Sequence, residues 1–180
     1  MKISTREIAL AAMFTAIMCV LTIMVRIFQP VMVLPFSLQP LVMLLAAYLL
    51  SPRAAFLSML AYLLLGLIGL PVFSSPPYGG PAYILVPSFG FLLGFPPAAW
   101  IQSRLIKKAT MTNFILAGLV GIIIYYIIGL PYMYLILNFY LKNSIDILKV
   151  IQIGFIPFIT LDLAKMAVAA LLARKLSTRL

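Results

Sequence analysis

The sequence has no histidine, one cysteine and three acidic residues among its 180 positions. Without histidine, the commonest side-chain metal ligand and general base is missing. The acidic residues, Glu7, Asp146 and Asp162, are too few for a carboxylate metal cluster. The single Cys19 excludes an intrachain disulfide, and its apolar neighbours favour a packing role. The sequence therefore predicts neither a metal site nor a bound cofactor.

Other absences limit the possible functions. There is no G-x-x-x-x-G-K-[ST] phosphate loop, so any ATP-driven process would need a separate ATPase subunit. An intramembrane enzyme would need a catalytic set, but the chain offers no histidine, no carboxylate pair and no serine in a nucleophile motif. We therefore do not expect an enzyme.

Charge is scarce as well. Only 9% of the residues are charged and 65% are hydrophobic, and the mean hydropathy is +1.20. Soluble domains carry about a quarter charged residues, so the composition predicts an integral membrane protein. The apolar runs are continuous and too long for the alternating strands of a barrel. We expect an all-α membrane protein with a single domain over residues 1–180.

Six apolar segments are separated by proline, glycine and charged residues, and they predict six transmembrane helices. The expected spans are Ile8–Val25, about Leu38–Leu50 with part of the preceding apolar stretch, Ala54–Leu70, Val86–Ile101, Ile115–Leu137 and one within Val150–Ala173. The breaks after the first span fall at Arg26, Gln29, Pro30 and Pro35, and Ser51–Arg53 is expected to form a tight turn. The first span lacks a small-residue cleavage site, so we expect an uncleaved helix rather than a signal peptide.

Two proline positions and one polar stretch refine this prediction. The fifth span is expected to bend or break at Gly129–Pro131, and Pro157 to interrupt the last one. Asn138–Lys149 is polar enough to be expected as a loop.

Basic residues gather at the ends of these spans and predict the orientation. If both termini are cytoplasmic, nine basic residues lie inside and three outside, as the positive-inside rule requires. The inside set is Lys2, Arg6, Arg53, Arg104, Lys107, Lys108, Arg174, Lys175 and Arg179, and the outside set is Arg26, Lys142 and Lys149. Topology therefore accounts for the net charge of +10, and we expect membrane lipid, not nucleic acid, around this chain.

The stretch Leu70–Pro81 interrupts the apolar pattern with proline, glycine and serine. A helix cannot run through Pro76-Pro77 followed by Gly79–Pro81. Irregular backbone beside a membrane must be satisfied by water, protein or a ligand. We predict a structured outer loop that caps a site.

Asp162 and Lys165 are the acidic and basic residues that fall deep within a span. Their spacing of three places them on one helix face. Each would cost about 2.5–3.5 kcal/mol at a helix centre, so exposure to lipid is disfavoured. Two interpretations remain open, an internal ion pair that only neutralises itself and a polar ligand site. Pro157 favours the ligand site, because it frees backbone groups nearby.

Small residues in the first span form Ala12-x-x-x-Ala16. This pattern lets another helix approach closely, so it suits either internal packing or docking of a partner subunit. Several aromatic residues lie near the outer loops, namely Phe28, Phe36, Phe73, Tyr78, Tyr83, Phe89 and Phe91. Most are expected in the interfacial belt, and a few close to the loop are candidates for lining a pocket.

Several motifs resemble those of the BioY family in the same order. They are PFSLQ at Pro35–Gln39, SPR at Ser51–Arg53, GLIGLPVF at Gly66–Phe73, the pair Gly79-Gly80, Pro87-Ser88 with Gly90, Gly94-Phe95, and PFITLDLAK at Pro157–Lys165. The resemblance covers about residues 8–175. The G-L-P-V-F run and the D-x-x-K pair are its most specific parts. BioY proteins are the biotin-specific S components of energy-coupling factor (ECF) vitamin transporters.

The resemblance implies six helices in a prokaryotic cytoplasmic membrane and an outward-facing vitamin pocket. It implies that Asp162 and Lys165 bind the substrate, and that Phe73–Tyr83 closes over biotin. It also implies that Ala12 and Ala16 contact the transmembrane coupling subunit of a module with two ATPase subunits. Phe91 stands where the family has a tyrosine, and Leu92 where some members have a basic residue.

The expected function is high-affinity biotin capture. The ureido ring of biotin suits Asp162 and Lys165, and its thioether ring and tail suit an apolar pocket. Tyr78 and Ser88 are further candidates for polar contacts, and Gln39 is another. The alternatives are an S component for another small vitamin or carboxylate, and a membrane scaffold without transport activity.

Overall fold

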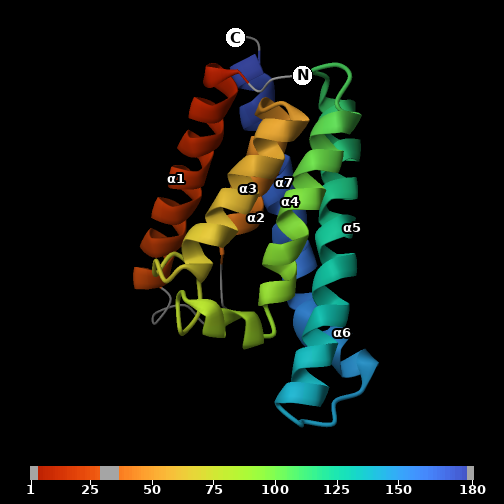
Figure 1. The fold of residues 1–180 in the computed structure, drawn as a ribbon. Coiled ribbons are helices and arrows are strands. Elements are labelled where there is room, and N and C mark those ends of the chain that lie inside the picture. The colour runs from red at the N-terminus through yellow and green to blue at the C-terminus, as the bar shows by residue number, and fades with distance from the viewer. Residues whose placement is uncertain (1–3, 29–36, 178–180) are drawn as a thin grey trace.

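The computed structural model describes residues 4–28 and 37–177. The features expected at Lys2, Gln29, Pro30, Pro35, Phe36 and Arg179 lie outside these residues. The helices are α1 (Thr5–Phe28), α2 (Gln39–Leu49), α3 (Pro52–Leu67), the short 3-10 helix η2 (Pro81–Leu85), α4 (Phe89–Leu105), α5 (Met111–Leu135), the π-helical turn η3 (Ile136–Tyr140), α6 (Ile147–Gly154) and α7 (Ile156–Ser177) (Figure 1). All regular structure in the described ranges is helical, which confirms the expected fold class.

The helices differ in length. Three segments are long and apolar enough to cross a membrane: Thr5–Phe28, Met111–Tyr140 and Ile147–Leu176. By contrast, α2 has 11 residues and rises about 16 Å, roughly half of a hydrocarbon core about 30 Å thick. Where the structure describes them, the six expected apolar segments are helical, the last one divided between α6 and α7, but they are not equivalent spans.

The predictions made for the two prolines, Pro131 and Pro157, had different outcomes. At Gly129–Pro131 a bend or a break was expected, and a break is wrong, because α5 continues through Pro131 and runs on into η3. Membrane helices tolerate an internal proline where other groups satisfy the freed carbonyl. The interruption near Pro157 is confirmed, since α6 ends at Gly154 and α7 begins at Ile156. The proline then occupies the first turn of α7, where its missing N–H has no helical partner to lose.

Two expected boundaries also moved. The loop expected over Asn138–Lys149 is too long, because η3 extends to Tyr140 and α6 begins at Ile147. The fourth helix starts at Phe89 rather than Val86, since Pro81–Leu85 forms η2, and it continues through Pro96 and Pro97 to Leu105.

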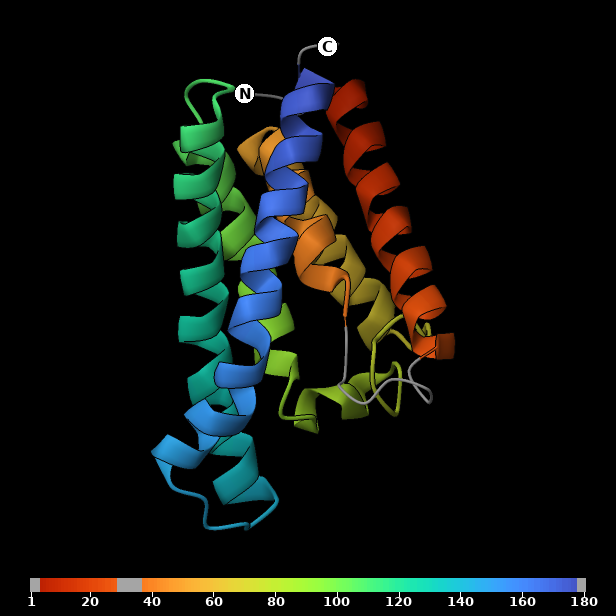
Figure 2. The ribbon, with the colours of Figure 1, turned by 180° about the vertical axis from the view of Figure 1, so that it is seen from behind.

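Figures 1 and 2 show the arrangement of the bundle. The start of α1, the turn between α2 and α3, the connection between α4 and α5, and the end of α7 lie at one end, the terminal end. The segment from α3 to α4, which contains η2, and the connection between α5 and α6 lie at the other, the cap end. In Figure 1, α1 and α5 form the two flanks, and α7 crosses behind α2, α3 and α4.

This arrangement separates the basic residues as the expected topology requires. At the terminal end lie Arg6, Arg53, Arg104, Lys107, Lys108, Arg174 and Lys175, and at the cap end lie Arg26, Lys142 and Lys149. The side of the membrane that each end faces stays a prediction.

The terminal end is tied together by side-chain caps. Ser4 and Glu7 form a reciprocal capping box at the start of α1, with the Ser4 N–H donating to the Glu7 carboxylate over 3.0 Å and the Glu7 N–H donating to the Ser4 hydroxyl over 3.2 Å. The same carboxylate also accepts from the Ser51 hydroxyl. Ser51 caps α3 by accepting from the Ala54 N–H, and Pro52 takes the first helical position. Glu7 therefore joins α1 to the α2–α3 turn.

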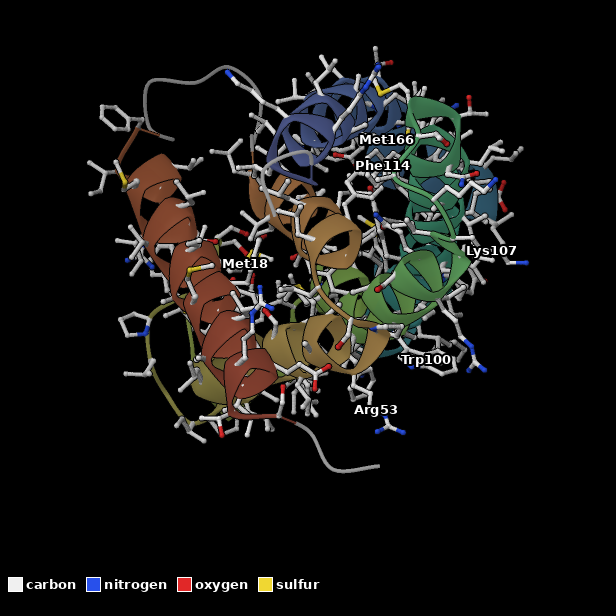
Figure 3. All side chains as sticks on the ribbon, turned by 90° about the horizontal axis from the view of Figure 1, so that it is seen from above. Met18, Arg53, Trp100, Lys107, Phe114 and Met166 are labelled. Carbon is white, nitrogen blue, oxygen red and sulfur yellow. The ribbon has the colours of Figure 1, made fainter. Side chains whose placement is uncertain are left out.

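Close packing of α4 on α5 forms one wall of the interior. Gly90, Gly94 and Ala98 repeat every four residues along α4, a pattern that lets helices approach closely in membranes. A methyl group at Gly94 would lie 2.6 Å from Cα of Tyr125, so only glycine fits there. Viewed from above, Met18, Phe114 and Met166 lie among the helices, while Arg53 and Lys107 point away from the bundle (Figure 3).

Candidate ligand-binding site

A cavity of about 380 Å³ lies inside the bundle towards the cap end. This volume is typical of small-molecule sites, which measure about 300–1,000 Å³. Most of its wall is apolar or aromatic, with a few polar groups from separate elements. The lining residues are Ser37, Gln39, Pro40, Ser74, Ser75, Pro76, Tyr83, Ser88, Phe91, Leu92, Phe95, Tyr125, Tyr126, Met133, Ile153, Gly154, Phe158, Asp162 and Lys165.

Asp162 and Lys165 form an ion pair on the face of α7 that lines the cavity. Their Oδ1 and Nζ atoms are 2.8 Å apart, and the two residues are 4% and 8% exposed. The spacing expected from the sequence therefore brings both groups to the cavity wall. Pairing lowers the cost of keeping two charges away from water.

Two tyrosines of α5 complete this polar cluster. Tyr125 and Tyr126 donate hydroxyl hydrogen bonds to Oδ2 of Asp162 over 2.7 and 2.9 Å. A carboxylate offers about four acceptor positions, and three protein donors already use Asp162. The cluster is thus preorganised, with room at the carboxylate for one further N–H donor.

Sequence reasoning missed Tyr125 and Tyr126. A usable signal was their position, two adjacent phenols in the middle of the expected span Ile115–Leu137. A hydroxyl at that depth must find a partner inside the protein. A buried carboxylate on another span was the natural partner, but only the fold shows that α5 and α7 face each other here.

Gln39 lines the cavity from the start of α2 and is 5% exposed. Its side-chain oxygen accepts from the Ser37 hydroxyl over 2.8 Å, and its amide donates to the Tyr62 hydroxyl. Tyr62 donates in turn to the Val72 carbonyl over 2.8 Å. This chain of bonds joins α2 and α3 to the segment that closes the cap end.

Ser88 and Phe91, two of the candidate site residues, also line the cavity. The Phe91 ring packs edge-on against Tyr126, with centroids 5.6 Å apart, and Phe95 packs similarly on Tyr125 at 5.5 Å. These contacts fix the tyrosines whose hydroxyls reach Asp162. The rings of α4 therefore both line the cavity and orient its polar cluster.

Two expected site residues lie elsewhere. Phe73 is fully buried behind the lining, with its ring centroid 4.2 Å from that of Tyr83. A methyl group at Gly66 would lie 2.0 Å from the Phe73 ring, so this glycine makes room for it. Tyr78 faces Arg26, whose guanidinium carbon lies 4.4 Å from the tyrosine ring centroid. Neither residue lines the cavity, although each supports a segment that does.

Ala12 and Ala16 are exposed on the outer face of α1, whereas the neighbouring Ala11 is buried. They share this face with the exposed Met13, Ile17 and Val20. The two alanines are therefore not used for packing within the bundle, which leaves them accessible to another membrane helix.

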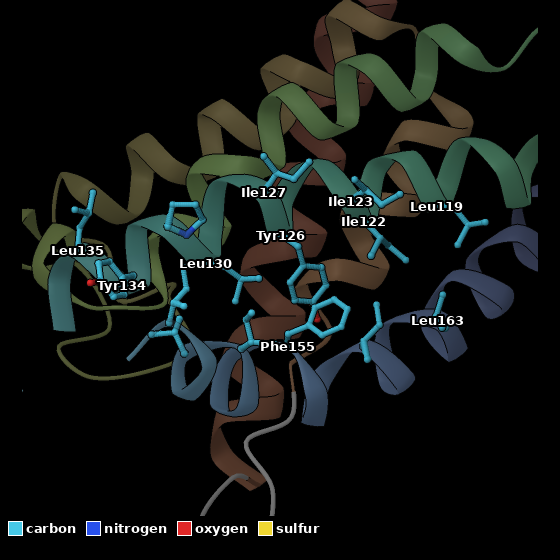
Figure 4. Close-up of a pocket in the computed structure, with 15 residues that line it drawn as sticks. Leu119, Ile122, Ile123, Tyr126, Ile127, Leu130, Tyr134, Leu135, Phe155 and Leu163 are labelled. Carbon is cyan, nitrogen blue, oxygen red and sulfur yellow. The ribbon is translucent and has the colours of Figure 1, made fainter. Parts of the chain in front are cut away.

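A second, larger hollow of about 700 Å³ opens on the outer face of α5, α6 and α7. Figure 4 shows its wall, which is built from leucine, isoleucine, valine, phenylalanine and proline, with Tyr126 and Tyr134 as its hydroxyl-bearing members. We call it the outer groove. Tyr126 lines both hollows, but its hydroxyl points to Asp162. The groove suits lipid chains, since it lacks the converging polar groups of a polar-ligand site.

The helical membrane fold and the cavity within the bundle, with a buried ion pair and converging hydroxyls, define a membrane-embedded small-molecule-binding protein. A family model described as the BioY family matches residues 1–180. The chain belongs to the BioY family.

Named relatives and a solved structure agree with this assignment. A "Probable biotin transporter BioY" from Lysinibacillus sphaericus is 38% identical over 176 residues, covering 96% of this chain and 87% of the relative. A "Biotin transporter BioY" from Thermotoga maritima is 37% identical over 173 residues, covering 95% of each. A crystal structure of the S-component for biotin from an ECF-type ABC transporter matches with a TM-score of 0.77 at 22% identity, covering 98% of this chain and 95% of that one. This last likeness shows that the fold is shared.

Proposed function

We propose that this protein captures biotin in the cavity and acts as the substrate-binding S component of an ECF-type transporter. The observation that carries the proposal is the preorganised cluster of Asp162, Lys165, Tyr125 and Tyr126 in a cavity of about 380 Å³. The curated relatives named as biotin transporters support biotin as the ligand.

The chemistry of biotin fits both the polar and the apolar parts of the cavity wall. The Asp162 carboxylate has capacity for a ureido N–H, and the Lys165 ammonium can donate to the ureido carbonyl. Phe91, Leu92 and Phe95 offer an apolar surface for the thioether ring and the aliphatic chain. The hydroxyls of Ser74 and Ser88 line the same cavity and can donate to the biotin carboxylate.

Transport requires partners that the chain does not contain. We propose that a transmembrane coupling subunit, carrying two ATPase subunits, docks on the outer face of α1 around Ala12 and Ala16. Both termini would then be cytoplasmic and the cap end would face outwards, as the distribution of basic residues favours. Residues 1–180 would act as one binding domain, with biotin as cargo and no resident cofactor.

Three alternatives give different outcomes. An S component for another small vitamin or carboxylate would bind that ligand in place of biotin. A scaffold without transport activity would bind no vitamin, and its ion pair would serve packing alone. An intramembrane enzyme would turn over an added substrate, but the named relatives are transporters.

The decisive experiment is calorimetric titration of the purified, detergent-solubilised protein with biotin, beside a panel of other vitamins such as thiamine, riboflavin and pantothenate. We expect saturable binding of one biotin per chain and none of the panel. Saturation by another vitamin, or no saturation by biotin, would contradict the assignment.

Docking is tested separately by adding bulk to α1. We expect Ala12→Leu with Ala16→Leu to prevent co-purification with the coupling subunit and ATPases while leaving biotin binding unchanged. Ile127→Phe enlarges an exposed side chain on α5, away from α1, and should not affect assembly. Equal assembly of both variants would remove α1 as the docking face.

A further inference from the structure

Arg26, near the end of α1, reaches across to the capping loop, which we define as residues Leu70–Pro81. Its Nη1 atom donates to the Pro71 carbonyl over 2.8 Å and to the Phe73 carbonyl at 3.4 Å. The same guanidinium lies over the Tyr78 ring, 4.4 Å from the centroid. One side chain of α1 therefore contacts three residues of the loop, 45 or more positions away in the sequence.

The backbone at Tyr78 depends on its surroundings. Its φ angle is +67°, in the left-handed region that a bulky side chain rarely adopts. Such a conformation persists where neighbouring contacts determine it. The Tyr78 N–H donates to the Ser75 carbonyl over 2.8 Å, and its carbonyl accepts from the Phe73 N–H over 2.8 Å. The ring lies under the Arg26 guanidinium and is not part of the cavity wall.

These bonds connect Arg26 to the cavity wall. The turn closed by Phe73 and Tyr78 carries Ser74, Ser75 and Pro76, which all line the cavity. Ser75 is further fixed by a 2.8 Å hydrogen bond between its hydroxyl and that of Tyr83, another lining residue. The contacts of Arg26 with Pro71, Phe73 and Tyr78 therefore help to fix the position of this part of the wall.

The base of the loop has an independent attachment. The Gly80 N–H donates to the Gly66 carbonyl of α3 over 2.7 Å, and the buried Phe73 ring packs against Gly66. Removing the Arg26 contacts should therefore loosen the turn over the cavity without detaching the whole loop. This separation allows Arg26 to be substituted with the fold retained.

We propose that Arg26 is a positioning residue that latches the capping loop closed over the ligand and so lengthens the residence time of the bound molecule. The identity of that ligand as biotin rests on the proposed function. A plain interfacial arginine would extend towards lipid headgroups and water, whereas this guanidinium is occupied by two backbone carbonyls and an aromatic ring. A hydrogen bond from a charged guanidinium is stronger than one between neutral groups, and the cation–π contact with Tyr78 adds further attraction.

The test compares Arg26→Gln with Lys149→Gln in the purified full-length protein. Lys149 is exposed on α6 at the same end, so its variant loses the same charge away from the loop. We expect Arg26→Gln to release biotin about tenfold faster, with the association rate changed by less than about twofold. In the protein without biotin, hydrogen exchange at the Phe73 and Tyr78 amides should accelerate. Lys149→Gln should match the wild type in both measurements.

A second pair of variants tests the ring contact and does not depend on the stability of the Arg26 variant. Tyr78→Phe keeps an aromatic face under the guanidinium and should behave as wild type. Tyr78→Leu removes it and should release biotin faster. If Arg26→Gln fails to fold, this pair decides the question.

The outcomes separate the latch from the ligand assignment. If the wild-type protein binds no biotin, the proposed function is refuted. Hydrogen exchange at the Phe73 and Tyr78 amides would still test whether Arg26 holds the capping loop. Biotin binding with equal release and equal exchange in Arg26→Gln and Lys149→Gln, or in both Tyr78 variants, would overturn the latch.

Discussion

Tyr126 lines both hollows of this protein, but the walls of the two hollows differ in polarity. The outer groove is larger, about 700 Å³ against about 380 Å³ for the cavity. Yet its wall is built almost entirely from hydrocarbon, whereas the cavity gathers an ion pair, two tyrosine hydroxyls of α5 and several serines. Volume alone does not identify a polar-ligand site. Converging polar groups, whose burial must be compensated, make the cavity the candidate site.

The contrast continues at single positions. Leu163 faces the groove and Asp162, its neighbour on α7, faces the cavity. Successive residues of a helix point about 100° apart, so one helix can present lipid-like and ligand-like faces. Matched substitutions of neighbouring residues can therefore separate the roles of the two hollows.

The largest effect is expected from the ion pair. Asp162→Asn should weaken biotin binding by about 100-fold or more, because it replaces the charged acceptor of the ureido N–H with a neutral amide and leaves the Lys165 ammonium without its carboxylate. Leu163→Ala, one residue away in the groove, should leave the dissociation constant within about twofold of the wild type. Calorimetric titration of both proteins measures the difference.

Since an unpaired buried lysine can destabilise the fold, the double variant Asp162→Asn with Lys165→Met serves as a control. It should recover thermal stability relative to Asp162→Asn and still bind biotin weakly. Recovery of tight binding in the double variant would assign the pair to packing.

An intermediate effect is expected from the tyrosine hydroxyls. Tyr125→Phe and Tyr126→Phe each remove one hydrogen bond to Asp162 at almost unchanged shape. Each bond holds the Asp162 carboxylate in the position proposed to receive the ureido N–H, so its loss makes the site less preorganised, and each variant should bind biotin about tenfold more weakly.

Tyr134→Phe removes a hydroxyl from the groove and provides the matched control. We expect its biotin affinity to equal that of the wild type. A loss similar to that of Tyr126→Phe would mean that the two hollows are not functionally distinct.

The smallest effect is expected where the groove is widened. Ile123 and Ile127 line it and are 53% and 65% exposed. Ile123→Ala with Ile127→Ala should change biotin affinity by less than about twofold, because lipid chains can fill the space left by the side chains. Titration in detergent and in lipid nanodiscs checks this, and a clear loss of affinity in both media would connect the groove to ligand binding.

Much of the site could be read from the residues. Asp162 and Lys165 were predictable because charges are costly in a membrane span and their spacing selects one helix face. Gln39, Ser88 and Phe91 were further candidates, and all three line the cavity. Tyr125 and Tyr126 were missed, since a phenol in a span is compatible with many partners. Phe73 and Tyr78 were expected at the cavity because they belong to the loop, but alternate side chains of a turn face different ways.

The sequence by itself determined the all-α membrane class, the apolar segments, the separation of basic residues between two ends and the family. These properties follow from composition and local pattern, which a bilayer translates directly into helices. Only the tertiary structure decided which hollow is polar, that α5 supplies two donors to Asp162, that α5 continues through Pro131, and that Arg26 clamps the capping loop. Each of these depends on segments far apart in the chain meeting at hydrogen-bonding distance, and no local pattern specifies such a meeting.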